Sequence, residues 1–73
     1  MAQFSLGSIY FKGENGIEKN LGKAIKFWEL AANQGFSKAQ FNLGVIYFKG
    51  ENGIEKNLEK VVKFWELAAN QGF

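Results

Sequence analysis

The chain has 73 residues, enough for one small domain, and its nine Lys and seven Glu give a formal net charge of +2. It contains no His, Cys, Asp, Arg, Thr or Pro. The residue types that build nucleophilic triads, zinc sites and bidentate phosphate clamps are therefore missing, so we expect no enzyme activity, no metal site and no cofactor.

The distribution of charge and apolar residues narrows the function classes further. The lysines are spread along the chain and form no dense basic stripe, so we do not expect nucleic-acid binding. No apolar run approaches the roughly 18 residues of a membrane-spanning helix, and the first residues lack a signal-peptide pattern. We therefore expect no membrane insertion, while the compartment stays open.

The sequence consists of two copies of one unit. Residues 2–36 align with residues 39–73 at a period of 37, and all but five of the 35 aligned positions are identical. The differences are Ser5/Asn42, Ser8/Val45, Gly22/Glu59, Ala24/Val61 and Ile25/Val62. Such a period predicts a helical repeat array in one domain, residues 1–73, with units at 1–36 and 37–73.

The first helix of each unit is expected to end at a glycine. Gly13 and Gly50 each follow a Lys, where a glycine closes a helix by adopting a left-handed conformation. The Asn-Gly pairs at 15–16 and 52–53 are also a hairpin signal, but their flanks lack the alternation of strands. We expect Ile17 and Ile54, the apolar residues of these loops, to pack between the helices.

The second helix of each unit is expected to begin after Asn20 or Asn57, which occupy N-cap positions. Apolar residues at three- and four-residue spacing predict one buried face in the first unit: Leu21, Ala24, Ile25, Trp28, Ala31 and Ala32. Trp28 and Trp65 would suit stacking on nucleic-acid bases, but their place on this regular face favours the core.

Polar residues at the start of the second unit's first helix predict a cap, and glycines inside both first helices predict close packing. Ser37 and Gln40 have the spacing of a capping box at the start of the second unit's first helix. Gly7 and Gly44 lie inside first helices, where Gly costs about 1 kcal/mol relative to Ala. We interpret them as positions where a neighbouring helix approaches closely.

Small residues, aromatics and glycines recur at fixed spacing in both units. The motif residues are Lys23-Ala24, Phe27-Trp28, Ala31-Ala32, Gln34-Gly35, Ala39-Gln40-Phe41-Asn42-Leu43-Gly44, Tyr47, Gly50, Gly53-Ile54 and Lys56-Asn57. This pattern resembles the Sel-one-like repeat, a relative of the tetratricopeptide repeat. Two departures are Asn at 20 and 57, where the family usually has Asp, and Phe at 27 and 64, where it has Trp or Tyr.

The resemblance implies an all-α fold, an α-α superhelix of the tetratricopeptide type with four helices in two antiparallel pairs. It also implies an adaptor, because family members commonly bring other proteins together in endoplasmic-reticulum quality control, bacterial envelope biogenesis and host interaction. The family's motif residues are structural, so the resemblance implies packing positions only. Both ends fall at a repeat boundary, and we expect a segment of a longer repeat array.

One stripe on the first helices is the candidate partner-binding face for a protein or peptide, since first helices line the concave surface of such solenoids. Its residues are Ser5, Ser8 and Lys12 in the first unit and Asn42, Val45 and Lys49 in the second. Two of the five internal differences fall on this stripe. Drift at exposed positions would produce the same differences.

Phe11 and Phe48 lie between the glycine loop and the buried face of each unit. If exposed, they would be aromatic anchors of the kind that dominate binding hot spots. We expect them to pack in the core against the neighbouring repeat.

Two functions therefore stay open. The first is a scaffold that binds a protein or peptide along its first helices. The second is a structural unit that forms a homo-oligomer by stacking end to end, because both units present nearly the same faces.

Overall fold

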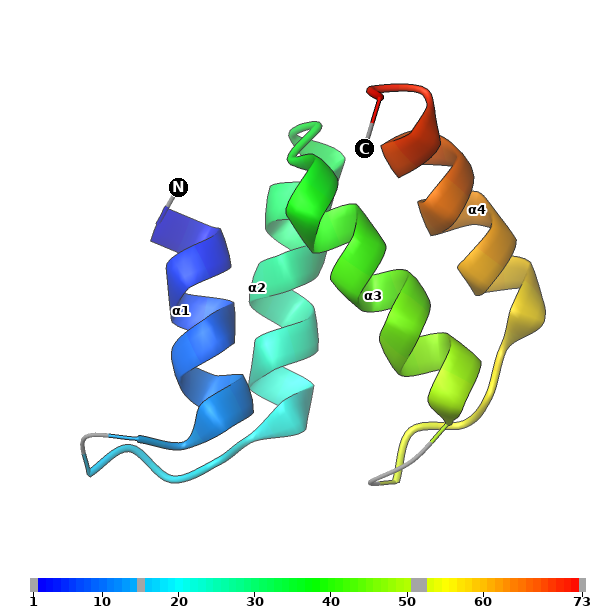
Figure 1. The fold of residues 1–73 in the computed structure, drawn as a ribbon. Coiled ribbons are helices and arrows are strands. Elements are labelled where there is room, and N and C mark those ends of the chain that lie inside the picture. Colours follow the sequence, from blue (N-terminus) through cyan, green and yellow to red (C-terminus); the bar gives the residue numbers. More distant parts are fainter. Residues whose placement is uncertain (1, 15, 51–52, 73) are drawn as a thin grey trace.

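Four α-helices make up the computed structural model, which describes residues 2–14, 16–50 and 53–72 (Figure 1). The helices are α1 (Ala2–Lys12), α2 (Leu21–Asn33), α3 (Ser37–Lys49) and α4 (Leu58–Ala69). These described residues contain no strand, so the predicted all-α fold is confirmed. The hairpin alternative rested partly on Asn15 and Asn52, which lie outside the described residues, and the described residues on either side of them contain no strand.

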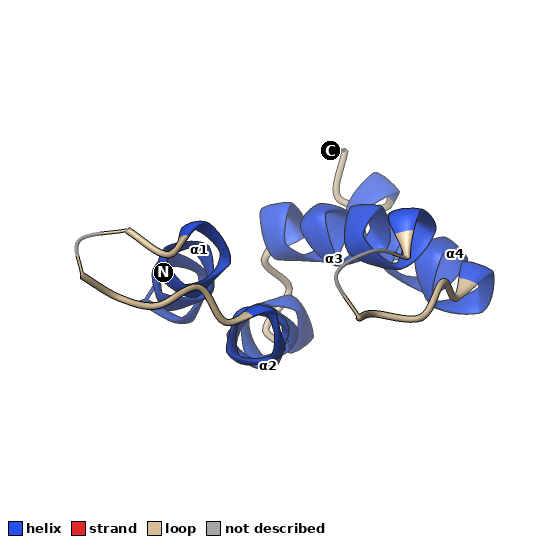
Figure 2. Ribbon diagram, turned by 90° about the horizontal axis from the view of Figure 1, so that it is seen from below, coloured by secondary structure: helices blue, strands red, loops and turns tan. Residues whose placement is uncertain are grey.

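Successive helices run antiparallel and form a single row. The α1–α2 and α3–α4 loops lie at one end of the row's helices, and the short α2–α3 turn lies at the other (Figure 1). Seen from below, α1 and α3 lie toward one side and α2 toward the other, so the row zigzags (Figure 2). Each helix packs on the next one in sequence, which confirms the two antiparallel pairs of the predicted superhelix.

Asparagine side chains cap the second helix of each unit. The Asn20 Oδ1 accepts a hydrogen bond from the backbone N–H of Lys23 at 3.0 Å, and the Asn57 Oδ1 accepts one from Lys60 at 3.1 Å. Each bond satisfies a backbone donor that has no partner within the helix. Both predicted N-caps are confirmed.

Glycines end the first helix of each unit, as expected. Gly13 and Gly50 have φ angles of 65° and 59°, in the left-handed region that side chains with a Cβ disfavour. Their backbone N–H groups donate to the carbonyls of Ile9 at 2.8 Å and Ile46 at 3.0 Å. The chain thereby leaves the helix with its last turn closed.

The predicted capping box at the start of α3 is wrong. Phe36 occupies the N-cap position without a side-chain hydrogen bond, and Ser37 is already the first residue of the helix. The α2–α3 turn is tight, because the backbone N–H of Phe36 donates back to the Ala31 carbonyl at 3.1 Å. The Gln40 side chain is buried and donates from Nε2 to the carbonyl of Ala32 at 3.1 Å.

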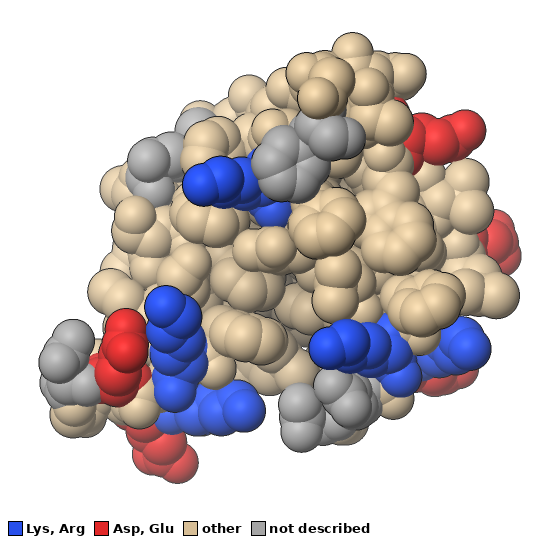
Figure 3. Space-filling model, in the orientation of Figure 1, with Lys and Arg blue, Asp and Glu red and all other residues tan. Residues whose placement is uncertain are grey.

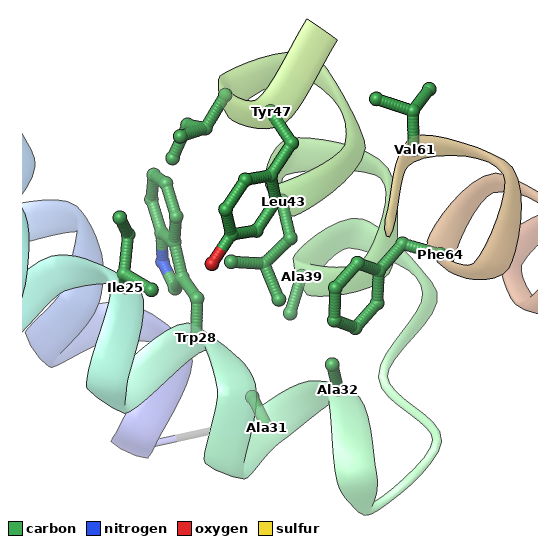
Figure 4. Packing of buried hydrophobic residues seen from close by; sticks show 10 residues of the cluster. Ile25, Trp28, Ala31, Ala32, Ala39, Leu43, Tyr47, Val61 and Phe64 are labelled. Carbon is green, nitrogen blue, oxygen red and sulfur yellow. The ribbon is translucent and has the colours of Figure 1, made fainter. Parts of the chain in front are cut away.

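The hydrophobic core lies where α2, α3 and α4 meet (Figure 4). Its members come from the predicted face of α2 and from the facing sides of α3 and α4: Ile25, Trp28, Ala31, Ala32, Ala39, Leu43, Ile46, Tyr47, Val61 and Phe64. The alanines on α2 and α3 carry only a methyl group, so the two helices approach closely. The Tyr47 ring reaches from α3 toward Ile25 and Trp28 (Figure 4).

Ile17 and Ile54 were both predicted to pack between the helices, but the structure buries only one of them. Ile54 is half-buried and packs against the core. Ile17 is exposed, and its prediction is wrong. The core is centred on α2, α3 and α4, so the second loop has apolar surface beside it that the first loop lacks.

Each first helix holds the tryptophan of its own unit against a glycine. A Cβ on Gly7 would overlap the indole ring of Trp28, and the indole Nε1 donates to the Phe4 carbonyl at 3.1 Å. Gly44 and Trp65 repeat this arrangement in the second unit. The interpretation of the helix glycines as points of close approach is confirmed.

We predict that Gly7→Ala destabilises the chain by about 1–3 kcal/mol, because Trp28 is buried and the rigid indole has little room to move. Gly22→Ala is the control, since the nearest atom to its added Cβ is the Asn20 Oδ1 at 3.4 Å. The control should be neutral or stabilising by up to about 1 kcal/mol. Urea unfolding followed by circular dichroism measures both, and a Gly7→Ala chain as stable as the parent would contradict the prediction.

The buried glutamine supplies a second test. Gln40→Ala removes the hydrogen bond to Ala32 and the one that the Gln40 Oε1 accepts from the Gln71 Nε2 at 2.8 Å, and it should lower the free energy of unfolding by about 1–2 kcal/mol. The matched control is Gln3→Ala, at the equivalent but half-buried position of α1, which should change stability by less than about 0.5 kcal/mol. Equal effects of the two substitutions in the same unfolding experiment would show that the hydrogen bonds of the Gln40 side chain do not stabilise the fold.

Candidate functional site

The face formed by α1 and α3 is hollowed between the two helices (Figure 3). The hollow has a cavity volume of about 340 Å³. Residues from both units line it: Ser8, Phe11 and Lys12 from α1, Trp28 from α2, and Phe41, Asn42, Val45 and Ile46 from α3. We call this feature the α1–α3 groove.

The groove has an apolar base and aromatic walls. Trp28 and Ile46 are buried core residues that reach its base. Phe11 on α1 and Phe41 on α3 are exposed and stand on opposite walls. Because α2 lies behind the groove and packs on both helices, its base is part of the folded core.

The structure brings most of the predicted stripe together. Four of its six residues line the groove: Ser8, Lys12, Asn42 and Val45. Ser5 is exposed on α1 but outside the groove lining, and Lys49 is exposed in the last turn of α3. Whether this face binds a partner stays a prediction.

The expected burial of Phe11 and Phe48 is wrong. Their side chains are 38% and 50% exposed, respectively. Each ring lies against the indole of its own unit, with centroids 5.3 Å apart for Phe11–Trp28 and 5.8 Å for Phe48–Trp65. The neighbouring repeat does not cover Phe11, because α2 holds α1 and α3 apart and leaves the groove between them.

Phe41 is a groove residue that the sequence analysis missed. It stacks on Trp65 with ring centroids 6.0 Å apart, and its exposed side forms a wall of the groove. Phe41, Val45 and Phe48 recur at four- and three-residue spacing, which is the signature of one helix face. This second apolar stripe on α3, beside its buried face, was the available signal.

Lysines lie at the margin of the groove, beside its aromatic rings. Lys12 is part of the lining, and the Lys19 Nζ is 5.9 Å from the ring centroid of Phe11. In the second unit, the Lys56 Nζ has the equivalent place, 5.7 Å from the ring centroid of Phe48, which lies outside the groove lining. Figure 3 shows lysines along the lower margin of this face, with acidic side chains beside them, and no charged side chain at its centre. The lining contains no carboxylate.

The apolar lining of the groove and its lysine suit the recognition of apolar and acidic groups.

The tryptophans do not offer a stacking surface for nucleic-acid bases. Trp28 is buried, which leaves no open face for stacking on a base, and Trp65 is half-buried between two phenylalanine rings. Within the described residues, no three His, Cys, Asp or Glu side chains gather as a metal site would require. None of the four described helices is long and apolar enough to cross a membrane.

Two antiparallel helix pairs, α1–α2 and α3–α4, pack side by side through the α2–α3 contact. This arrangement defines a helical repeat protein. The Sel1 repeat model, that of the Sel-one-like family, matches the chain twice, over residues 1–36 and 37–73. The chain belongs to the Sel1 repeat family, which confirms the resemblance identified from its motif residues. Sel1 repeats are generally protein–protein interaction modules on non-enzymatic helical scaffolds.

Two solved structures have the same fold. A Sel1 repeat protein from Oxalobacter formigenes is 49% identical, with a TM-score of 0.89 over 99% of this chain and 29% of that one. The c5321 protein, a protective antigen of uropathogenic Escherichia coli strains with an SLR fold, is 38% identical, with a TM-score of 0.88 over 99% of this chain and 15% of that one. This chain thus spans less than a third of either protein. A sequence comparison with curated proteins returns no match.

Proposed function

We propose that the chain is an interaction scaffold that binds an apolar segment of another protein in the α1–α3 groove, as part of a longer repeat array. The observation that carries this proposal is the apolar groove itself, with its exposed aromatic walls on a buried base. The longer array is supported by the solved relatives, of which this chain spans 29% and 15%.

The groove is suited to large apolar side chains. Its volume of about 340 Å³ lies at the lower end of typical ligand pockets and suits one or two such side chains. The Phe11 and Phe41 rings rest on indoles that are themselves held by hydrogen bonds to backbone carbonyls. Rings held in place before binding lose little conformational entropy when a partner arrives, which favours affinity.

The charges around the groove favour acidic residues beside the apolar anchors of a partner. Lys12, in the last turn of α1, lines the groove, and Lys19 lies beside the Phe11 ring in its wall. Lys49 is in the equivalent last turn of α3. The lining has no carboxylate, so an acidic flank meets no like charge within the groove itself. Exposed lysines contribute mainly to the association rate and to salt dependence.

Selection of random displayed peptides against the chain tests this function. We expect the selected peptides to combine aromatic or aliphatic residues with Asp or Glu. Fluorescence anisotropy with one labelled peptide should then show Lys12→Glu plus Lys49→Glu weakening binding about 3- to 30-fold, as two exposed charges reversed would. Phe11→Ala should weaken it at least about 30-fold, because it removes an exposed aromatic ring of the groove wall, the kind of residue that dominates binding.

The matched control is Lys26→Glu plus Lys63→Glu, which makes the same charge change on exposed residues of α2 and α4. This control should leave the dissociation constant within about twofold of the parent, apart from a small long-range effect that added salt removes. Peptides that bind all variants equally would place recognition outside the groove.

A second candidate function is a structural unit that stacks on copies of itself. The observation that favours it is the unequal burial of equivalent residues: Leu6 on α1 and Val62 on α4 are exposed, whereas their counterparts in α3 and α2 are buried. Such apolar faces on the outer sides of α1 and α4 support self-association of this chain.

Light scattering over a concentration series tests this second candidate. A self-stacking unit should show a weight-average mass that rises continuously with protein concentration, since an open contact forms chains of increasing length. Constant monomer mass up to millimolar concentration would rule it out and would leave the groove proposal untouched.

A further inference from the structure

Asn42 is a residue of the α1–α3 groove to which recognition of apolar and acidic groups gives no role. The apolar lining suits apolar anchors, and Lys12 suits acidic residues beside them. Two uncharged polar side chains, Ser8 and Asn42, also line the groove. Their hydrogen bonds within the chain differ, and this difference decides what each can offer to a ligand.

The Ser8 hydroxyl already binds its own helix. It donates to the Phe4 carbonyl, four residues earlier, at 3.1 Å, so it has no hydrogen left for a ligand. The Trp28 indole donates to the same carbonyl at 3.1 Å. Both of these groove residues therefore have their single side-chain donor engaged within the chain.

The Asn42 carboxamide, in contrast, is available to a ligand. Its side chain is half-buried on the α3 wall, and no hydrogen bond joins this side chain to any other described residue. Within the described ranges, no side-chain nitrogen or oxygen is both buried and unpaired, so the carboxamide reaches water. It offers an acceptor oxygen and two donor hydrogens on one planar group.

A ligand that fills the groove displaces the water at this carboxamide. A carboxamide that loses water without gaining a partner weakens binding, so a ligand that fits must supply both a donor and an acceptor. Each residue of a peptide carries one N–H and one C=O. In an extended backbone both groups of one residue point to the same side, whereas a helix pairs them internally toward its opposite ends. The carboxamide therefore matches an extended segment.

The place of Asn42 in the groove fits the same kind of ligand. In an extended segment, side chains stand on the two faces of the strand while the N–H and C=O groups point sideways. The apolar base of the groove is formed by Trp28 and Ile46, and Asn42 lies on the α3 wall beside it. Apolar side chains can enter toward the base while the backbone of the segment faces Asn42.

We infer that the groove binds its partner as an extended segment, with the N–H and C=O of one ligand residue paired to the Asn42 side chain. The ligand N–H donates to the Asn42 Oδ1, and the Asn42 Nδ2 donates to the ligand carbonyl. This inference rests on the proposed function and adds the backbone conformation of the ligand and the residue that selects it. Asn42 thereby fixes the position of the apolar anchors and of their acidic flank relative to Phe11 and Lys12.

The first unit supplies a matched control position. Ser5 is equivalent to Asn42 but is exposed on α1 and lies outside the groove lining. Leu has nearly the shape of Asn and no hydrogen-bonding group, so Asn42→Leu removes the carboxamide and keeps the wall filled. Ser5→Leu introduces the same side chain outside the groove, and Ser8→Ala removes a hydroxyl inside it.

The test measures fluorescence anisotropy with a labelled peptide from the random display, and circular dichroism verifies the fold of each variant. Asn42→Leu should weaken binding at least about tenfold, because the ligand N–H and C=O lose water and gain no partner. Ser5→Leu and Ser8→Ala should keep the dissociation constant within about twofold of the parent. Asn42→Ala replaces Asn42→Leu if that variant does not fold.

Ester substitution in the peptide gives a second measurement, made on the unaltered chain and on Asn42→Leu. Replacing one backbone amide by an ester removes a single N–H and leaves every side chain in place. At one position this change should weaken binding to the parent about tenfold and binding to Asn42→Leu less than about threefold. The two losses differ because the variant lacks the carboxamide that accepts from this N–H.

Unchanged or tighter binding to Asn42→Leu would overturn the inference, since a helical ligand gains affinity when an unpaired carboxamide is removed. Equal ester losses in the parent and in Asn42→Leu would overturn it as well, as would a Ser8→Ala loss as large as that of Asn42→Leu. In each of these cases, weaker binding to Phe11→Ala would still support the groove as the binding site. A peptide that binds the parent, Phe11→Ala and Lys12→Glu plus Lys49→Glu equally would overturn the proposed function, and the inference with it.

Discussion

The indole of Trp28 against Gly7 is the contact on which the first unit depends. Among the described residues of α1, only Gly7 is buried, so the helix has little core of its own to hold it. The ring lies against the helix backbone where a side chain would otherwise be, and its N–H satisfies the Phe4 carbonyl. The same indole carries the Phe11 ring and reaches the base of the groove, which links the packing of the helix pair to the shape of the candidate site.

The helices and their ends could be predicted because their capping groups act on backbone atoms a few residues away. The groove could not, because its shape depends on the distances between helices. Asn20 and Gly13 act on backbone groups a few residues away, so their roles could be predicted from the sequence. The capping box failed because the turn before α3 is closed by backbone hydrogen bonds, which left Gln40 to bond with a different helix. The exposure of Phe11 could not be predicted, because it follows from how far α2 separates α1 from α3.

Identical residues in the two units differ in burial, because different helices surround them. Tyr47 is buried among residues of α2 and α4, while the identical Tyr10 is half-buried beside Phe27. Local order in α1 is therefore expected to be lower than in α3, although most of their residues are the same, because fewer buried apolar contacts protect its backbone hydrogen bonds. Sequence identity between repeats establishes the same helices but not the same stability.

The walls of the groove belong to different repeats, with Phe11 in the first and Phe41 in the second, and the α2–α3 contact joins the two repeats. Its width is thus a property of the angle between neighbouring units. A tension or bend applied along an array of such units would open or narrow every groove at once. In the proposed array, the affinity of the groove for a partner would therefore depend on how strongly the array is bent.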